Sequence, residues 1–358
     1  MSLNETTVAA TRYPFDALIQ FSQQLLMKAS MPQDKAHSVA DVLVRGDGFG
    51  MNTHGLALLP AYLRDIASGG MRVEGEPEVI RDFAACLTLD GKKLPGPWLV
   101  QKAVREGMAR AERYGTAVVS IQNSHHAACL SCYLQEATDN GFAIFIALTD
   151  PGHRSVAPFG GTSPVLTSNP IAFGAPTSGQ PILIDMSTSM ITNGAASRKL
   201  KTGEQFDWPV LQDAQGNPST DPAVLTNNPP GTILPLGGIE AGHKGYAIGL
   251  MTEVLSGCLS GRGRAEKRDG WSASITLTLY APDALAGTDT YLRQVDALVS
   301  ACHDSPPKPG VKEVLIPGER GLRSLAQSKK EGVILPEWLV KTFEEMAQTQ
   351  GMIFPSAC

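Results

Sequence analysis

The chain has 358 residues, of which 42% are hydrophobic and 18% charged, with a formal net charge of −5 and a pI near 5.8. This length is enough for two lobes, and the composition excludes a disordered chain and a basic nucleic-acid-binding protein. The N-terminus lacks a basic region followed by an apolar one, and no run reaches the ~20 apolar residues of a membrane helix. We therefore expect a cytoplasmic protein without membrane or nucleic-acid partners, whose six scattered cysteines are reduced.

The first third of the chain is predicted to be mainly helical. Apolar residues recur at helical spacing over 13–30, 31–47 and 58–71. Pro32 suits the start of the second helix, and a Gly-Gly pair closes the third. Residues 78–91 read as strand that ends in an Asp-Gly turn.

The rest of the chain alternates strands and helices. Strands are predicted at 116–122, 142–149, 181–187 and 272–280, and helices at 99–115, 125–141, 243–261, 289–302 and 336–350. A strand, a helix and a strand within roughly 30 residues form a βαβ unit, so the sheet should be at least partly parallel. The glycines of 46–50 follow a helix rather than a strand, so they are interpreted as a turn and not as a Rossmann fingerprint.

The stretch 123–130, "NSHHAACL", follows a buried strand. We predict a helix start there, with Asn123 or Ser124 as N-cap and the backbone N–H groups of 125–128 forming an anion site. Open α/β sheets bind ligands at the carboxyl ends of their strands, and a histidine in such a place can donate a proton near neutral pH. This favours His125 and His126 as functional residues.

Two other interpretations of the same stretch involve its cysteines. Structural zinc needs two separated ligand pairs, whereas every candidate ligand here lies between His125 and Cys132. A redox dithiol needs its first cysteine at a helix N-terminus, and Cys129 is predicted to lie a full turn inside the helix. Small core cysteines are the default, and we predict no metal site.

Further polar residues stand at predicted element ends. Thr53 and His54 lie between two glycines, where the alternative is a helix start capped by Thr53. A long loop, 158–176, precedes a strand whose carboxyl end carries Asp185, which could orient a histidine or cap the following "MSTS". Lys244 precedes a helix between glycines, where it could meet a phosphate or a carboxylate or simply be solvated.

Taken in chain order, these motifs resemble the malate/L-lactate dehydrogenase family of the non-Rossmann type. That family includes sulfolactate, ureidoglycolate and 2,3-diketogulonate enzymes and the Δ1-piperideine-2-carboxylate/Δ1-pyrroline-2-carboxylate reductases. The resemblance covers nearly the whole chain, through "D-x-x-G-x-x-THG" (47–55), "SHHAA", "APFGG", "SNPIAFGAP", "IDMSTS", "QDAQGNPSTDP", "ILPLGG", "HKGYAIGLMTEVLSG" and "IPGER".

The resemblance implies reduction of a small 2-keto acid, or oxidation of the 2-hydroxy acid, with NAD or NADP. It implies that His125 is the catalytic acid and base, that Thr53 and His54 match a Ser-His pair, and that Asp185 completes a relay with that pair. The positions that match cofactor-binding stretches are His125, His126, Ala127, Ala128, Cys129, Ser168, Asn169, Met186, Ser187, Lys244, Gly318, Glu319 and Arg320.

The resemblance also implies an architecture. We expect an α/β fold like that of sulfolactate dehydrogenase, with a mixed sheet and a non-Rossmann NAD(P)-binding lobe over 115–265. Residues 1–114 and 266–358 are expected to form a second α/β lobe for catalysis and dimerisation, in a homodimer.

Three positions depart from the family pattern. Threonine stands for serine at Thr53, a histidine for the usual phenylalanine at His126, and Leu58 falls where many members carry an arginine suited to the substrate carboxylate. Either another group binds that carboxylate or the substrate differs. A cyclic imino acid reductase is therefore one alternative, and a non-catalytic small-molecule binding protein on the same scaffold is another.

Overall fold

The computed structural model describes residues 11–265 and 270–358, and the chain divides into two compact units. One unit combines both chain ends, 1–74 and 319–358, and the other spans 75–318. The division of the structure differs from the predicted lobe boundaries, which fall after residues 114 and 265. Boundaries at those two points would cut a seven-stranded sheet whose strands come from both sides of them. Which unit holds the cofactor stays a prediction.

The large unit is built on a mixed sheet with the strand order β2-β3-β4-β11-β5-β6-β7. Only β3 and β4 pair in parallel within this sheet, and the other neighbours are antiparallel. The predicted α/β class and partly parallel sheet are confirmed. The strands of the predicted βαβ unit, β4 and β5, are not neighbours, because β11 lies between them and pairs with both. The strands are β2 (Glu78–Phe83), β3 (Cys86–Asp90), β4 (Thr116–Ser124), β5 (Ala143–Thr149), β6 (Ile171–Ala175), β7 (Ile182–Met186) and β11 (Ala273–Tyr280).

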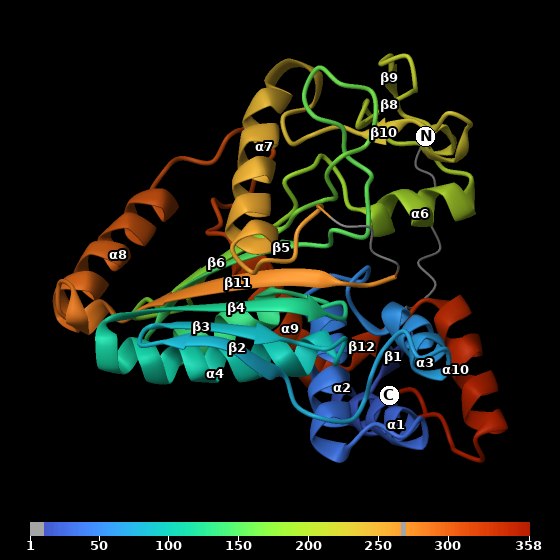
Figure 1. Cartoon of the computed structure of the whole chain (residues 1–358), viewed down its shortest axis with the longest axis horizontal. Coiled ribbons are helices and arrows are strands. Elements are labelled where there is room, and N and C mark those ends of the chain that lie inside the picture. The colour runs from blue at the N-terminus through green and yellow to red at the C-terminus, as the bar shows by residue number, and fades with distance from the viewer. Residues whose placement is uncertain (1–10, 266–269) are drawn as a thin grey trace. The chain divides into compact units, whose positions relative to one another are not determined.

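Helices cover the sheet on both faces (Figure 1). The helix α4 (Gly96–Tyr114) packs on β4 and β11, and Gly107 lets it approach Leu277 and Leu279 closely. The helix α5 (Ser131–Asp139) packs on β5, β6 and β7, while α7 (Gly238–Glu253), extended by the π-helical turn η3 (Val254–Cys258), packs on β5. The helix α8 (Thr288–His303) follows β11. These layers bury the central strand β11 almost entirely.

A smaller sheet, in the order β10-β8-β9, lies in the same unit. It consists of β8 (Leu211–Gln212), β9 (Pro218–Ser219) and β10 (Thr232–Ile233), with the 3-10 helix η2 (Pro222–Thr226) between them. Its apolar core includes Val156, Leu166 and Ile233. The adjacent helix α6 (Asn193–Thr202) is capped by Thr192, whose hydroxyl accepts the N–H of Ala195 at 3.2 Å.

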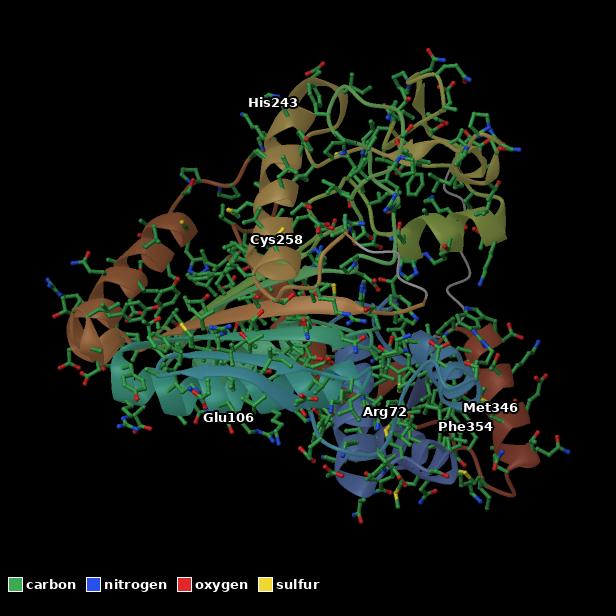
Figure 2. The ribbon with its side chains drawn as sticks, in the orientation of Figure 1. Arg72, Glu106, His243, Cys258, Met346 and Phe354 are labelled. Atoms are coloured by element: carbon green, nitrogen blue, oxygen red, sulfur yellow. The ribbon has the colours of Figure 1, made fainter. Side chains whose placement is uncertain are left out.

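The unit made of both chain ends is helical around a two-stranded ribbon. Its elements are β1 (Arg12–Tyr13), α1 (Phe15–Lys28), α2 (Gln33–Gly48), the 3-10 helix η1 (Leu56–Leu58), α3 (Leu59–Ala67), α9 (Glu319–Glu331), β12 (Val333–Ile334) and α10 (Glu337–Thr349). Its core contains a ring cluster of Tyr13, Phe21, Phe343 and Phe354, the last of which is labelled in Figure 2. The predicted helices at 13–30, 31–47, 58–71 and 336–350 are confirmed.

The structure differs from the prediction in two elements of the large unit. The strand region 78–91 is a hairpin of β2 and β3 rather than one strand. The helix expected from residue 125 begins at Ser131. The reason is the backbone of Ala128, whose φ of 55° lies in the left-handed region that a right-handed helix excludes.

Candidate functional site

His125 lies directly after the end of β4 and not at a helix N-terminus. Its backbone N–H donates to the carbonyl of Leu94 at 3.1 Å, and its own carbonyl accepts the hydroxyl of Ser124 at 2.8 Å. The carbonyls of His125 and His126 pack against Gly96, where a side chain would overlap them. The imidazole of His125 is buried. The predicted anion site from helical N–H groups at 125–128 is therefore wrong, because these residues are not helical.

The side chain of Asp185 binds the N-terminus of α5, the kind of position at which a ligand anion was expected. From the carboxyl end of β7, its Oδ2 atom accepts the backbone N–H of Ser131 at 2.8 Å and the Ser131 hydroxyl at 3.0 Å. A carboxylate is stabilised at this end of a helix by both hydrogen bonding and the helix dipole. Asp185 is therefore the cap of α5 rather than of the "MSTS" segment. Its relay with Thr53 and His54 stays a prediction.

The cysteines of this region are buried. Cys129 precedes α5 and Cys132 lies in its first turn, so the expectation that Cys129 lies a full turn inside a helix is wrong. A hydrogen bond with Cys132 and burial raise the pKa of the Cys129 thiol, which stays protonated and is a poor nucleophile and metal ligand. In the ranges that the structure covers, no three His, Cys, Asp or Glu side chains are grouped to hold a metal ion.

Four of the motifs meet through consecutive backbone hydrogen bonds. The N–H of Thr188 donates to the carbonyl of Ser168 at 2.9 Å, and the N–H of Leu236 donates to the carbonyl of Thr188 at 2.9 Å. The N–H of Gly245 then reaches the carbonyl of Leu236 at 3.2 Å. The structure thus brings together the motifs that contain the predicted cofactor residues Ser168, Met186, Ser187 and Lys244. The side chain of Lys244 is exposed beside this junction.

Other predicted cofactor residues serve the fold or belong to the other unit. The amide of Asn169 is buried and donates to the carbonyl of Gly249 at 3.1 Å and to Glu253 at 2.9 Å, so its side chain is part of an internal network. Gly318, with φ of 106°, packs against Leu183 of β7, where a side chain would overlap. The remaining two, Glu319 and Arg320, begin α9 in the unit made of both chain ends.

The second histidine segment is the His54 loop, residues 49–55, which connects α2 to η1. The hydroxyl of Thr53 and Nδ1 of His54 are hydrogen-bonded at 2.9 Å. The helix η1 begins after Gly55, so Thr53 is not its N-cap and that alternative is wrong. The carboxylate of Asp47, on the last turn of α2, accepts the N–H of Leu56 at 2.7 Å. Asp47 therefore fixes the far end of the loop that carries His54.

Asp47 has an unusual electrostatic state. Burial raises its pKa to about 7, although the hydrogen bond from the Leu56 N–H opposes this shift. The sequence motifs included Asp47 only as the first position of "D-x-x-G-x-x-THG", without a role of its own. His153 and Trp271 were not among the candidate residues, and their rings contact each other near His126. A signal existed for His153, since "D-x-x-H" directly after a predicted strand places an acid and an imidazole within reach.

Comparison with known proteins identifies the family. The sequence profile of the family described as "Malate/L-lactate dehydrogenase" matches residues 13–344. The chain belongs to this family. An L-lactate dehydrogenase of Cupriavidus necator is 31% identical over 346 residues, which cover 94% of this chain and 97% of that protein. The predicted family membership is confirmed.

Solved structures of related proteins share the fold. The sulfolactate dehydrogenase of Methanocaldococcus jannaschii superimposes with a TM-score of 0.85 at 25% identity, covering 96% of this chain and 98% of its own. The Δ1-piperideine-2-carboxylate reductase of Pseudomonas syringae has a TM-score of 0.83 at 24% identity, covering 94% and 99%. The first comparison confirms the expected likeness to sulfolactate dehydrogenase. The likeness to the reductase, at 24% identity, shows the fold alone.

Membership of this dehydrogenase family makes the protein an oxidoreductase that acts on small molecules, and enzymes of the family use nicotinamide cofactors. The enzyme interpretation is confirmed over the non-catalytic one. At the motif junction, exposed Lys244 supplies a cation that suits a phosphate group, whereas Ala127 and Ala128 are buried. None of the helices in the described ranges is long and apolar enough to cross a membrane.

Proposed function

We propose that this enzyme interconverts a small 2-hydroxy acid and its 2-oxo acid with NAD or NADP, and that His125 is its acid and base. The observation that carries the proposal is the position of His125, at the carboxyl end of β4, in a chain that is similar to lactate and sulfolactate dehydrogenases. This is the edge of an α/β sheet at which ligands bind. The bound nicotinamide supplies or accepts the hydride.

The residues of the chain have distinct parts in this proposal. His125 protonates the substrate oxygen during reduction and removes that proton in the reverse direction. Burial of its imidazole keeps the proton transfer away from bulk water. Thr53 orients His54 through Nδ1, and Lys244 meets a cofactor phosphate. Because Leu58 carries no charge, the substrate carboxylate is bound by a group other than the arginine of many relatives.

Turnover measurements test this function. Purified protein should oxidise NADH or NADPH with pyruvate or oxaloacetate, and the ratio of the two kcat/KM values identifies the cofactor. The variant His125→Ala should lower kcat by about 10²- to 10⁴-fold, the scale of a general acid. The control is His37→Ala, an exposed histidine of α2 hydrogen-bonded to Gln23, which should leave kcat unchanged. Equal turnover by His125→Ala and the wild type would contradict the assignment.

The same measurements include Δ1-piperideine-2-carboxylate as substrate. Turnover of this imine without turnover of any 2-oxo acid would replace the proposed reaction by the cyclic imino acid reduction. Binding of NADH or NADPH without turnover of either substrate class would overturn both.

We also propose that the enzyme is a homodimer associated through α7. The buried face of this helix is lined by glycines, including Gly242, Gly245 and Gly249, whereas its apolar side chains point outward. Leu250, Met251 and Val254 are 42%, 44% and 54% exposed. An amphipathic helix normally buries such side chains, so this apolar face has a second packing partner. A second copy is the occupant expected from the homodimer that the family resemblance implies, although α7 lies outside the residues 1–114 and 266–358 to which dimerisation was assigned.

The surface in question runs along α7 and η3, between the labelled His243 and Cys258 (Figure 2). The helix α8, which lies wholly within the described part of the chain, has no buried residue. Light scattering after gel filtration should give twice the mass of the chain, and Met251→Lys with Val254→Glu should shift it to the mass of one chain. A single-chain mass for the wild type would overturn the dimer.

A further inference from the structure

Three imidazoles gather around the indole of Trp271. The ring centroids of His126 and His153 lie 4.3 Å and 5.0 Å from that of Trp271, and the centroid of His125 lies at 6.1 Å. The sheet register explains the meeting. The strand β11 begins two residues after Trp271 and runs antiparallel between the carboxyl ends of β4 and β5, so Trp271 lies between the segments that follow those two strands.

The His153 side of this cluster is held by an ion pair between the exposed ring of His153 and the buried carboxylate of Asp150. The Nδ1 atom of His153 lies 3.2 Å from the Asp150 carboxylate, which also accepts the N–H of Gly152 at 3.0 Å. The guanidinium of Arg264 donates to the His153 carbonyl at 2.8 Å and is paired with Glu253 at 2.6 Å. A ring whose loop is fixed by such supporting contacts is preorganised rather than free to rotate.

The other side of the cluster is fixed as well. The N–H of Ala128 donates to Nδ1 of His126 at 3.3 Å, so this nitrogen is an acceptor and the ring carries its proton on Nε2. The hydroxyl of Ser272, next to Trp271, is hydrogen-bonded to the side chain of Asn123 at 3.4 Å. Trp271 is thus attached to the same segment that presents His125 and His126.

The cluster has the chemistry of a surface for aromatic ligands. The hydrogen bond with Asp150 raises the pKa of His153, so this ring is cationic over more of the neutral range and is attracted to the indole. The ring of His126 and the indole add flat, polarisable area, and both are half-buried, while His153 is exposed. Aromatic rings prefer to pack on such surfaces in offset or edge-to-face geometry.

We propose that Trp271, His126 and His153 form a stacking subsite for a planar aromatic ring beside His125. Two rings have this chemistry: the aryl group of an aromatic 2-oxo acid and the nicotinamide of the cofactor. The inference rests on the proposed function only for the choice of these two rings. In the first case the subsite makes the enzyme prefer aryl over alkyl 2-oxo acids, and in the second it contributes to cofactor affinity.

The test compares Trp271→Ala and Trp271→Phe with the wild type. The control is Trp208→Ala, which removes a tryptophan that is 60% exposed in the same unit. Calorimetry measures the Kd of NADH, NADPH and phenylpyruvate, and kinetics give kcat/KM for phenylpyruvate and pyruvate. Stacking of about 0.5–1.5 kcal/mol corresponds to a loss of about 2- to 13-fold on removal of the indole.

An aryl-substrate subsite predicts that Trp271→Ala weakens phenylpyruvate alone, in both Kd and kcat/KM, and that Trp271→Phe restores most of the loss. A nicotinamide subsite predicts weaker cofactor binding and an equal loss for both substrates. Unchanged constants in Trp271→Ala, or the same losses in Trp208→Ala, would overturn the subsite. Because calorimetry needs no turnover, an inactive wild type would contradict the proposed function while the binding constants still decide the subsite.

Discussion

The His54 loop and the His125 segment, residues 125–128 after β4, hold their histidines by different means. In the His54 loop the contact is a side chain, the buried carboxylate of Asp47, which accepts the N–H of Leu56. In the His125 segment the contacts are backbone groups, because the N–H of His125 bonds to the Leu94 carbonyl and its own carbonyl packs on Gly96. A carboxylate can change its charge near neutral pH, whereas peptide groups cannot. Of these two sets of contacts, only the one that holds the His54 loop should therefore change with pH.

The largest expected effect concerns the charge of Asp47. Burial raises its pKa from 3.8 to about 7, so between these values the folded chain binds a proton that the unfolded chain releases. The stability contributed by the protonated Asp47 is complete below about pH 4 and is lost as the pH rises through 7. Asp47→Asn removes this dependence, so the variant should gain on the order of 4 kcal/mol relative to the wild type between pH 4 and pH 8.

Urea unfolding at several pH values measures this difference. Gly96→Ala, at the start of α4 and against the carbonyls of His125 and His126, provides the contrast, since its loss of stability should be the same at every pH. A constant difference between Asp47→Asn and the wild type across this range would show that Asp47 is not buried in the way described.

A middle-sized effect is expected from the glycines that back the two segments. A side chain at Gly96 would overlap the carbonyl oxygens of His125 and His126, and one at Gly55 would overlap the Asp47 carboxylate. Backbone carbonyls cannot turn away, whereas a carboxylate can rotate. Gly96→Ala should therefore lower the free energy of unfolding by about 1–3 kcal/mol, the range of overpacking, and Gly55→Ala by less. A larger loss for Gly55→Ala than for Gly96→Ala in urea unfolding would contradict the idea that the backbone contacts of Gly96 are the more rigid.

The smallest expected effect comes from the cap of α5, close to the His125 segment. Asp185→Ala removes both acceptor contacts to Ser131 and should cost about 0.5–2 kcal/mol. Thr192→Ala is the matched control, because it removes the cap of α6. Both variants should lose similar stability, but only Asp185→Ala should also lower kcat if Asp185 has the predicted relay role. Equal kcat values in the two variants would reduce Asp185 to a helix cap.

Much of the site could be anticipated because it is encoded locally. Thr53 and His54 are adjacent in the sequence and hydrogen-bonded in the structure, and the strand before His125 follows from a run of apolar residues. The start of α5 could not be anticipated, because helix propensity alone does not reveal the left-handed backbone of Ala128. The capping role of Asp185 depends on β7 lying near α5, and β7 is 54 residues away from Ser131 in the chain.

The sequence by itself determined the family, the α/β class and most helices and strands, because these depend on motif order and on hydrophobic period. The tertiary structure alone decided which side chains meet at the carboxyl edge of the sheet. The strand β11 comes more than a hundred residues after β4 and β5, yet it pairs between them and brings Trp271 to His126 and His153. Strand register is set by packing across the whole sheet, so no local pattern of residues carries it.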